Sequence, residues 1–179
     1  MKKMFLVALS LCLLVACTSE IRHEKKTESA PVEIIQQPAE FADMKYAEIG
    51  KKILSALSNG DMAGYTASYS DNAVYQWNNG DSLAGKPAIT EYWTKRRTEA
   101  IDSVTFSNEI WLPIKVNQPQ SVEAPGIWLL GWYQVNAKYK TGKRMVQWMH
   151  IDFHFDASDK IDRVIQYVDM VPINAAMTK

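Results

Sequence analysis

The stretch that decides the fold covers residues 126–169, in the last third of a chain of 179 residues. It reads GIWLLGWYQVNAKY from Gly126, MVQWMHIDFHF from Met145 and KIDRVIQYVD from Lys160. β-Branched and aromatic residues dominate each run, as is typical of strands. Short polar segments around Gly142 and at residues 156–159 separate the runs and are rich in turn-forming residues. The stretch therefore predicts three long strands that form an antiparallel meander.

Upstream of the meander, the apolar residues of three segments recur at helical spacing. The first segment covers residues 39–58, has a period close to 3.6 and ends at Asn59-Gly60. Asp61 is a suitable N-cap for a short second helix over residues 62–69. The third helix opens at Gly85-Lys86-Pro87, where proline in the first turn loses no hydrogen bond.

Two further strands are predicted, over residues 73–77 and 104–115. Pro113 has no N–H to donate to a ladder, so we expect the second strand to be bulged there or to lie at an edge. Alternation along this strand places five residues on one face: Val104, Phe106, Asn108, Ile110 and Leu112. The order of helices and strands predicts an α+β domain, with helices packed on one face of a curved, mostly antiparallel sheet.

The first residues carry a targeting pattern. Lys2 and Lys3 precede an apolar run of about twelve residues, which is typical of a signal peptide and short for a membrane span. The run ends in LVAC, and this ending resembles the lipobox of bacterial lipoproteins, in which Cys17 would be lipidated. The alternative is a plain secretory signal that happens to contain a cysteine. Cys12 lies within the apolar run, so no cysteine follows position 17 and no disulfide is expected.

These patterns divide the chain into a signal peptide (1–16), a flexible tether (17–38), one folded domain (39–172) and a tail (173–179). The tether is polar, contains two prolines and lacks a sustained apolar period. A membrane partner through lipid on Cys17, in a bacterial cell envelope, follows from the lipobox.

The charge pattern gives no sign of a nucleic-acid partner. Twenty basic and twenty acidic side chains give a formal charge of zero, and no basic cluster alternates with aromatic residues. The run Lys95-Arg96-Arg97 is interpreted as a solvated helix face, because no converging backbone amides indicate a phosphate site beside it. We expect no cofactor.

Five segments together resemble the nuclear transport factor 2-like (NTF2-like) superfamily, in particular its SnoaL-like branch. They are LSNGDM at 57–62, YSDNAV at 69–74, GKPAITEYW at 85–93, FHFDASDKI at 153–161 and QYVD at 166–169. The resemblance covers about residues 40–170. It implies a conical half-barrel in which three N-terminal helices and a curved sheet enclose a pocket.

The resemblance also locates the positions at which related enzymes carry their catalytic groups. The oxyanion tyrosine and the general-base aspartate of ketosteroid isomerases fall at Ile53 and Trp77, and their protonated aspartate falls at Ile151. The aspartate of limonene epoxide hydrolases falls at Gln166, and glutamine cannot act as a base at neutral pH. The implied pocket of Ile53, Trp77, Trp93, Ile151 and Gln166 therefore lacks these acids and bases, and no catalytic residue is assigned. Its aromatic residues either fill the cone or line a ligand pocket.

His150, Asp152 and His154 form a second candidate constellation, since residues two apart share one face of a strand. Histidine and carboxylate are competent metal ligands, but same-face neighbours stand roughly 6.6–6.8 Å apart along a strand. Met149, Ile151 and Phe153 occupy the opposite, apolar face, so the three polar residues are expected on the convex face, in solvent or at a dimer interface. We expect no metal site there.

Three functional hypotheses follow from the sequence. The first is a membrane-anchored, non-catalytic domain that binds a small apolar ligand or a protein partner. The second is an isomerase, cyclase or hydrolase of SnoaL type with non-standard catalytic residues, centred on Gln166 or a nearby tyrosine. The third is a structural module that forms a homodimer through its sheet.

Overall fold

The computed structural model describes residues 37–118 and 124–178. The described residues all belong to one compact unit of the chain, Ile35–Lys179. The predicted signal peptide, the lipidation site Cys17 and nearly all of the predicted tether lie outside the described residues.

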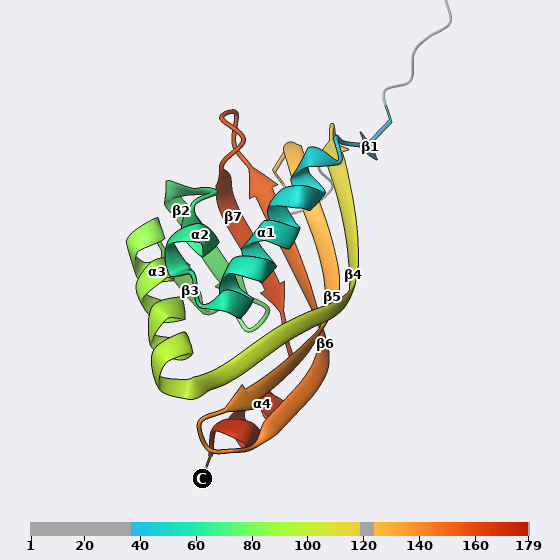
Figure 1. The fold of residues 1–179 in the computed structure, drawn as a ribbon. Helices are drawn as coiled ribbons and strands as arrows, with labels where there is room; N and C mark the ends of the chain where they lie inside the picture. Colours follow the sequence, from blue (N-terminus) through green and yellow to red (C-terminus); the bar gives the residue numbers. More distant parts are fainter. Residues whose placement is uncertain (1–36, 119–123, 179) are drawn as a thin grey trace, which may run out of the picture. The chain divides into compact units, whose positions relative to one another are not determined.

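The described residues of this unit form seven strands, four α-helices and one π-helical turn (Figure 1). In chain order they are β1 (Ala39–Phe41), α1 (Lys45–Asn59), α2 (Met62–Thr66), β2 (Tyr69–Trp77), β3 (Ser82–Ala84), α3 (Lys86–Lys95), the π-helix η1 (Arg96–Ala100), β4 (Ile101–Val116), β5 (Gly126–Tyr139), β6 (Arg144–Phe155), β7 (Ile161–Tyr167) and α4 (Met170–Met177). No helix in this described part combines the length and apolar character needed to cross a bilayer.

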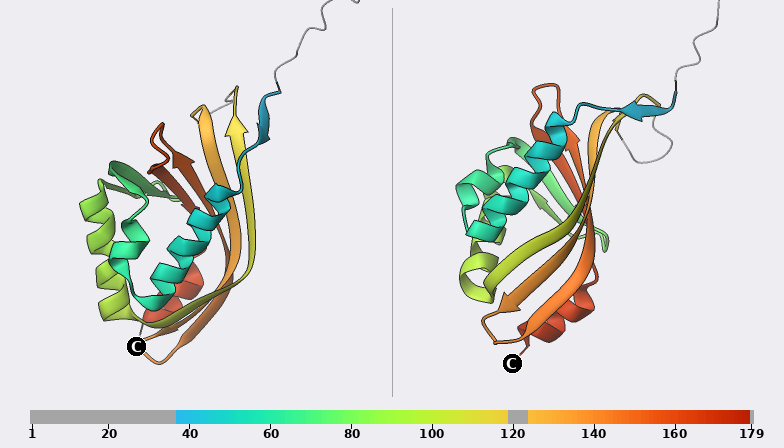
Figure 2. Two further views of the ribbon diagram at one scale, coloured as in Figure 1. Left: turned by 45° about the horizontal axis from the view of Figure 1, so that its top comes forward. Right: turned by 45° about the vertical axis from the view of Figure 1, so that its right-hand side comes forward.

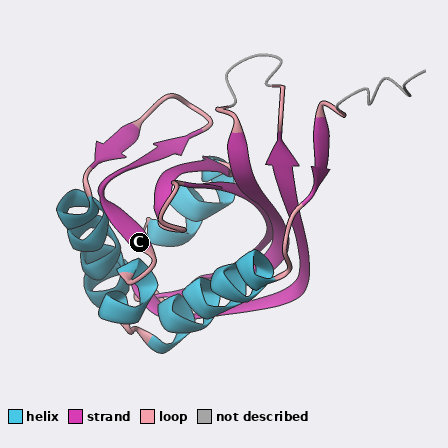
Figure 3. Cartoon of the chain, turned by 90° about the horizontal axis from the view of Figure 1, so that it is seen from above, coloured by secondary structure: helices cyan, strands magenta, loops and turns pink. Residues whose placement is uncertain are grey.

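The strands form one open sheet with the order β1-β4-β5-β6-β7-β2-β3. All neighbouring pairs are antiparallel except β2 and β7, which run parallel. The sheet curves, and helices α1, α2 and α3 lie across its concave side (Figures 2 and 3). The predicted α+β arrangement of three helices on a curved, mostly antiparallel sheet is therefore confirmed.

Local sequence explains where the three helices begin and end. Gly60 ends α1 in the left-handed conformation (φ 76°), which glycine adopts without steric cost, and its N–H donates to carbonyls of the last turn. The Asp61 side chain accepts a hydrogen bond of 2.8 Å from the Gly64 N–H and thereby caps α2. Proline in the first turn of α3 follows the predicted pattern.

The predicted first helix begins later than expected. Residues 39–41 form the edge strand β1 instead, and Phe41 pairs with Ile114 of β4. The sequence also gave no indication of β3, a three-residue strand that pairs with β2. Both strands are too short for alternation to be visible in the sequence.

The predicted single face of β4 is wrong beyond Ser107. Pairing with β5 shifts register between Ser107 and Ile110, and Asn108 adopts a positive φ of 54°. This bulge reverses the alternation. Ile110 is consequently 55% exposed, and Trp111 turns inward against β5, where a Cβ on Gly131 would overlap its ring. At Pro113 there is no bulge, but among the described strands β1 covers β4 only from Ile114 onward.

The predicted tail at 173–179 is also corrected. Residues 170–177 form helix α4, which Asp169 caps through a hydrogen bond of 2.8 Å from the Val171 N–H. Ile173 and Ala176 are buried in the same core cluster as the helices and the sheet. The domain therefore extends beyond residue 172, because its last apolar residues complete the core.

Candidate functional site

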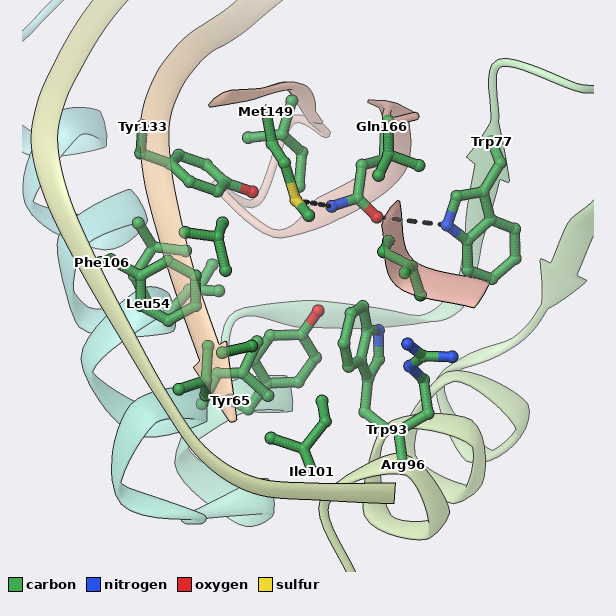
Figure 4. Close-up of a pocket in the computed structure, with 18 of the residues that line it drawn as sticks. Leu54, Tyr65, Trp77, Trp93, Arg96, Ile101, Phe106, Tyr133, Met149 and Gln166 are labelled. Carbon is green, nitrogen blue, oxygen red and sulfur yellow. Dashed lines mark hydrogen bonds between the residues drawn. The ribbon is translucent and has the colours of Figure 1, made fainter. Parts of the chain in front are cut away.

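A cavity lies between the concave side of the sheet and helices α1 to α4, with a volume of about 70 Å³ (Figure 4). The five residues predicted for the pocket all line it: Ile53, Trp77, Trp93, Ile151 and Gln166. Strand register explains part of this grouping, since Gln166 of β7 pairs with Trp77 of β2 on one side and with Ile151 of β6 on the other.

Gln166 is the polar centre of the cavity. Its Oε1 accepts hydrogen bonds from the Tyr75 hydroxyl at 2.7 Å and from the Trp77 Nε1–H at 3.2 Å. Its Nε2 lies 3.7 Å from the sulfur of Met149, which is a weak acceptor. The carbonyl side of this buried amide is therefore satisfied, whereas its N–H groups retain donor capacity.

The tyrosines of the cavity add further hydroxyl groups. Tyr65, Tyr75 and Tyr133 all line it and are almost fully buried. Burial raises the pKa of each phenol well above its ordinary value, because the charged form is poorly solvated there. At neutral pH these groups are uncharged hydrogen-bond donors.

Trp93 packs among three aromatic rings and brings an unsatisfied donor. Its ring lies 5.6 Å from that of Tyr65, 6.0 Å from Tyr75 and 5.4 Å from Tyr92. Its Nε1–H is buried and has no hydrogen-bond partner among the described residues. A buried donor without a partner costs about 1–3 kcal/mol.

Arg96 is the charged residue of the cavity wall. It stands three residues after Trp93, so the two side chains leave the helix on the same face. Its guanidinium lies 5.6 Å from the centre of the Tyr92 ring. Arg96 also lies close to the phenol of Tyr139. Burial raises the pKa of Tyr139, and the positive charge of Arg96 and its hydrogen bond to the phenol counteract part of that rise.

The interpretation of Lys95-Arg96-Arg97 as a solvated face holds only for Lys95, which is exposed. Arg96 lines the cavity, and Arg97 donates to the carbonyl oxygens of Ile101 and Ser58 at 3.3 and 3.4 Å. The spacing of Tyr92, Trp93 and Arg96 at three and four residues was the signal that could have placed Arg96 inside.

Among the described residues that line the cavity, none is Asp, Glu or His. The wall is made of aliphatic, aromatic and methionine side chains, with Gln166, the phenols, two indoles and Arg96 as its polar groups. This arrangement can donate several hydrogen bonds to an apolar molecule that carries an acceptor atom.

His150, Asp152 and His154 lie on the face of β6 opposite the cavity. His150 stacks on Trp132 at 4.4 Å, and its Nε2 lies 2.9 Å from the Asp152 carboxylate. His154 instead contacts Asp162 at 2.6 Å, so the two histidines turn to different carboxylates. Within residues 37–118 and 124–178, no group of three His, Cys, Asp or Glu side chains is placed to hold a metal ion.

Comparison with known proteins identifies the fold. No family model and no curated protein matches the sequence. Among solved structures, a provisionally named polyketide cyclase of Xanthomonas campestris pv. campestris is similar with a TM-score of 0.61 and 14% identity, over 75% of this chain and 98% of the other. An NTF2-like protein of unknown function from Burkholderia pseudomallei gives a TM-score of 0.58 and 11% identity, over 74% and 97% of the two chains.

An epoxide hydrolase of M. tuberculosis, described as LEH-like, is also similar, with a TM-score of 0.51 and 17% identity over 73% of this chain and 86% of the other. These likenesses show that the described unit has the NTF2-like α+β cone fold, as the resemblance of the sequence implied. Proteins of this fold carry different chemistries, so the fold alone does not name a reaction.

Proposed function

We propose that this chain is a binding protein for a small apolar molecule that carries a hydrogen-bond acceptor, and that it is held at a bacterial envelope membrane by lipid on Cys17. The observation that carries the binding role is the excess of donors in the cavity. Trp93 Nε1–H is buried without a partner, Gln166 Nε2 donates to the weak sulfur acceptor of Met149, and the described lining holds no carboxylate or imidazole.

The volume of the cavity limits the size of the ligand that it can bind. Its volume of about 70 Å³ is roughly half of the ~150 Å³ that binds benzene in an engineered protein cavity. A ligand is therefore slender, or it enters by displacing adaptable side chains. Met145, Met149 and Met170 line the cavity, and methionine adjusts its shape at low cost.

Bound molecules can be sought directly by native mass spectrometry of the purified protein, followed by solvent extraction. Ala137→Met fills the cavity from β5 and should abolish copurification, while leaving the fold at least as stable. Ala63→Met makes the same change at an exposed position of α2 and should leave copurification unchanged. Equal recovery of small molecules from both variants would refute binding inside the cone.

Membrane attachment is tested separately in cells. If Cys17 is lipidated, Cys17→Ala should move the protein from the membrane fraction to the soluble fraction. Cys12→Ala, within the proposed signal peptide, should leave it membrane-bound. A membrane-bound Cys17→Ala protein would contradict the anchor.

The outer face of the sheet supports a second candidate role, self-association. Trp148 is 52% exposed on this face, and Ile110, Val146 and Tyr167 are exposed there too. Exposed apolar patches of this kind mark contact sites. Light scattering at high protein concentration should show a dimer that Trp148→Lys dissociates, and a monomeric wild-type protein would rule out this role.

Catalysis of SnoaL type is the remaining alternative, and it is supported by the similarity to a polyketide cyclase and an epoxide hydrolase. Gln166 is then the residue that orients the substrate. Turnover of hydrophobic ketones or epoxides that survives Gln166→Ala would exclude this role for Gln166.

A further inference from the structure

The unpaired N–H donor of Trp93 indicates which kind of ligand the cavity binds. Its Nε1–H is shielded from solvent and unpaired, although the ring around it is tightly packed among Tyr65, Tyr75 and Tyr92. Native structures seldom leave a buried donor unsatisfied. An acceptor atom supplied by a ligand would remove this cost.

Arg96, the neighbouring cation, favours an acceptor that carries a negative charge. Arg96 lines the same cavity, and no Asp or Glu among the described residues forms an ion pair with it. Figure 4 shows Arg96 beside Trp93 in the wall of the cavity. Their three-residue spacing puts an indole N–H and a guanidinium side by side, and a planar carboxylate can accept from both.

The rest of the cavity excludes a second charge. Leu54 and Phe106 lie in the part of the wall away from Arg96, and both are apolar (Figure 4). A single guanidinium balances one negative charge, and a dianion such as a phosphate monoester would leave charge uncompensated in apolar surroundings. Pairing with a monoanion satisfies both the cation and the indole.

We propose that the ligand is an amphipathic carboxylate, whose carboxyl group binds between Trp93 Nε1–H and the Arg96 guanidinium and whose short alkyl or aryl part fills the cavity toward Leu54 and Phe106. This inference rests on the proposed binding function and specifies the class of ligand for that same site.

Matched pairs of acid and amide test the inference by calorimetric titration of the purified protein. Phenylacetate is compared with phenylacetamide, and hexanoate with hexanamide, because each amide keeps the apolar part and removes the charge. The wild-type protein should bind each acid at least about tenfold more tightly than its amide, since a hydrogen bond to a charged group contributes about 1.5–3 kcal/mol.

Two variants locate the carboxyl group. Arg96→Gln should weaken binding of the acids by about tenfold or more and binding of the amides by much less, so that the preference for acids largely disappears. Trp93→Phe keeps the ring and removes the donor, and it should weaken acid binding by about fivefold. Lys95→Gln removes the same charge from an exposed neighbour and should change acid binding by less than about twofold.

The outcomes separate this inference from the proposed function. Equal affinity for acid and amide, or a preference for acids that survives Arg96→Gln, would overturn the carboxylate inference and leave apolar binding in place. If no acid or amide binds and Ala137→Met behaves like wild type in copurification, both proposals fall. Thermal unfolding of each variant shows whether a lost affinity reflects a lost fold.

Discussion

The side-chain oxygen of Gln166 holds two aromatic side chains in place at the wall of the cavity. That oxygen accepts from Tyr75 at 2.7 Å and from Trp77 at 3.2 Å, and both donors come from β2. The sequence located Gln166 and Trp77 through the resemblance of their surrounding segments. It did not indicate Tyr75, because alternation says that a residue faces inward and not which polar atom it meets there.

Replacement of Gln166 by leucine should show how much this acceptor contributes to the stability of the fold. The variant leaves two donors without a partner, and we expect the free energy of unfolding to fall by about 2–4 kcal/mol in urea titrations. In a Tyr75→Phe background the same change should cost less, since one of the two donors is already absent. Additive losses in the double variant would show that the two side chains do not interact.

His150 should make the stability of the sheet depend on pH. Burial by itself lowers the pKa of His150, but the Asp152 carboxylate and the Gly131 carbonyl oxygen, 3.0 Å from Nδ1, outweigh it and raise the pKa above 6.5. The folded state then binds the proton more tightly than the unfolded state. The stabilisation is complete below the unfolded pKa and is lost as pH rises through the folded pKa.

The measurement compares His150→Gln with the wild-type protein in urea titrations across pH. The wild-type advantage in unfolding free energy should be greater at about pH 5.5 than at about pH 8. Comparison at each pH cancels the contributions of other titrating groups. A difference that stays constant with pH would contradict the proton linkage.

At the scale of elements, the bulge in β4 shows where pattern reasoning failed. Alternation assumes an unbroken ladder, and the extra residue at Asn108 changes which side chains face the core from there onward. For this reason Trp111 reaches the interior and packs on Tyr133, with the two ring centres 6.1 Å apart. Asparagine tolerates positive φ better than most residues, but nothing in the sequence marks Asn108 among the other asparagines.

Helix α4 was missed because eight residues show barely two turns of periodicity. Its contribution can be measured with two substitutions on opposite faces. Ile173 is 5% exposed, so Ile173→Ala should lower the free energy of unfolding by about 2–4 kcal/mol. Val171 is 74% exposed, and Val171→Ala should change it by no more than about 0.5 kcal/mol. Similar small effects at both positions would restore the view of this segment as a tail.

At the scale of the whole molecule, the meander was sufficient to predict the architecture. Three long strands with one apolar face must be covered, and the upstream helices supply the only long amphipathic segments in the described sequence. The alternation of side chains along β6 also correctly placed Ile151 on the cavity face and His150 and Asp152 on the opposite face. The free volume of the cone was beyond prediction, because it depends on how the rings of Trp93, Tyr75 and their neighbours rotate and pack.

The short strand β1 has a mechanical consequence. Its three exposed residues are held to β4 by ladder hydrogen bonds and by the pair Glu40–Lys115 at 3.0 Å. Any tension on the N-terminal segment reaches this strand before it reaches α1. Because β1 contributes no residue to the core cluster, we expect its detachment from the sheet edge to cost less free energy than opening of the core strands. We therefore expect β1 to be the first element of the described domain to yield to tension from the N-terminal side.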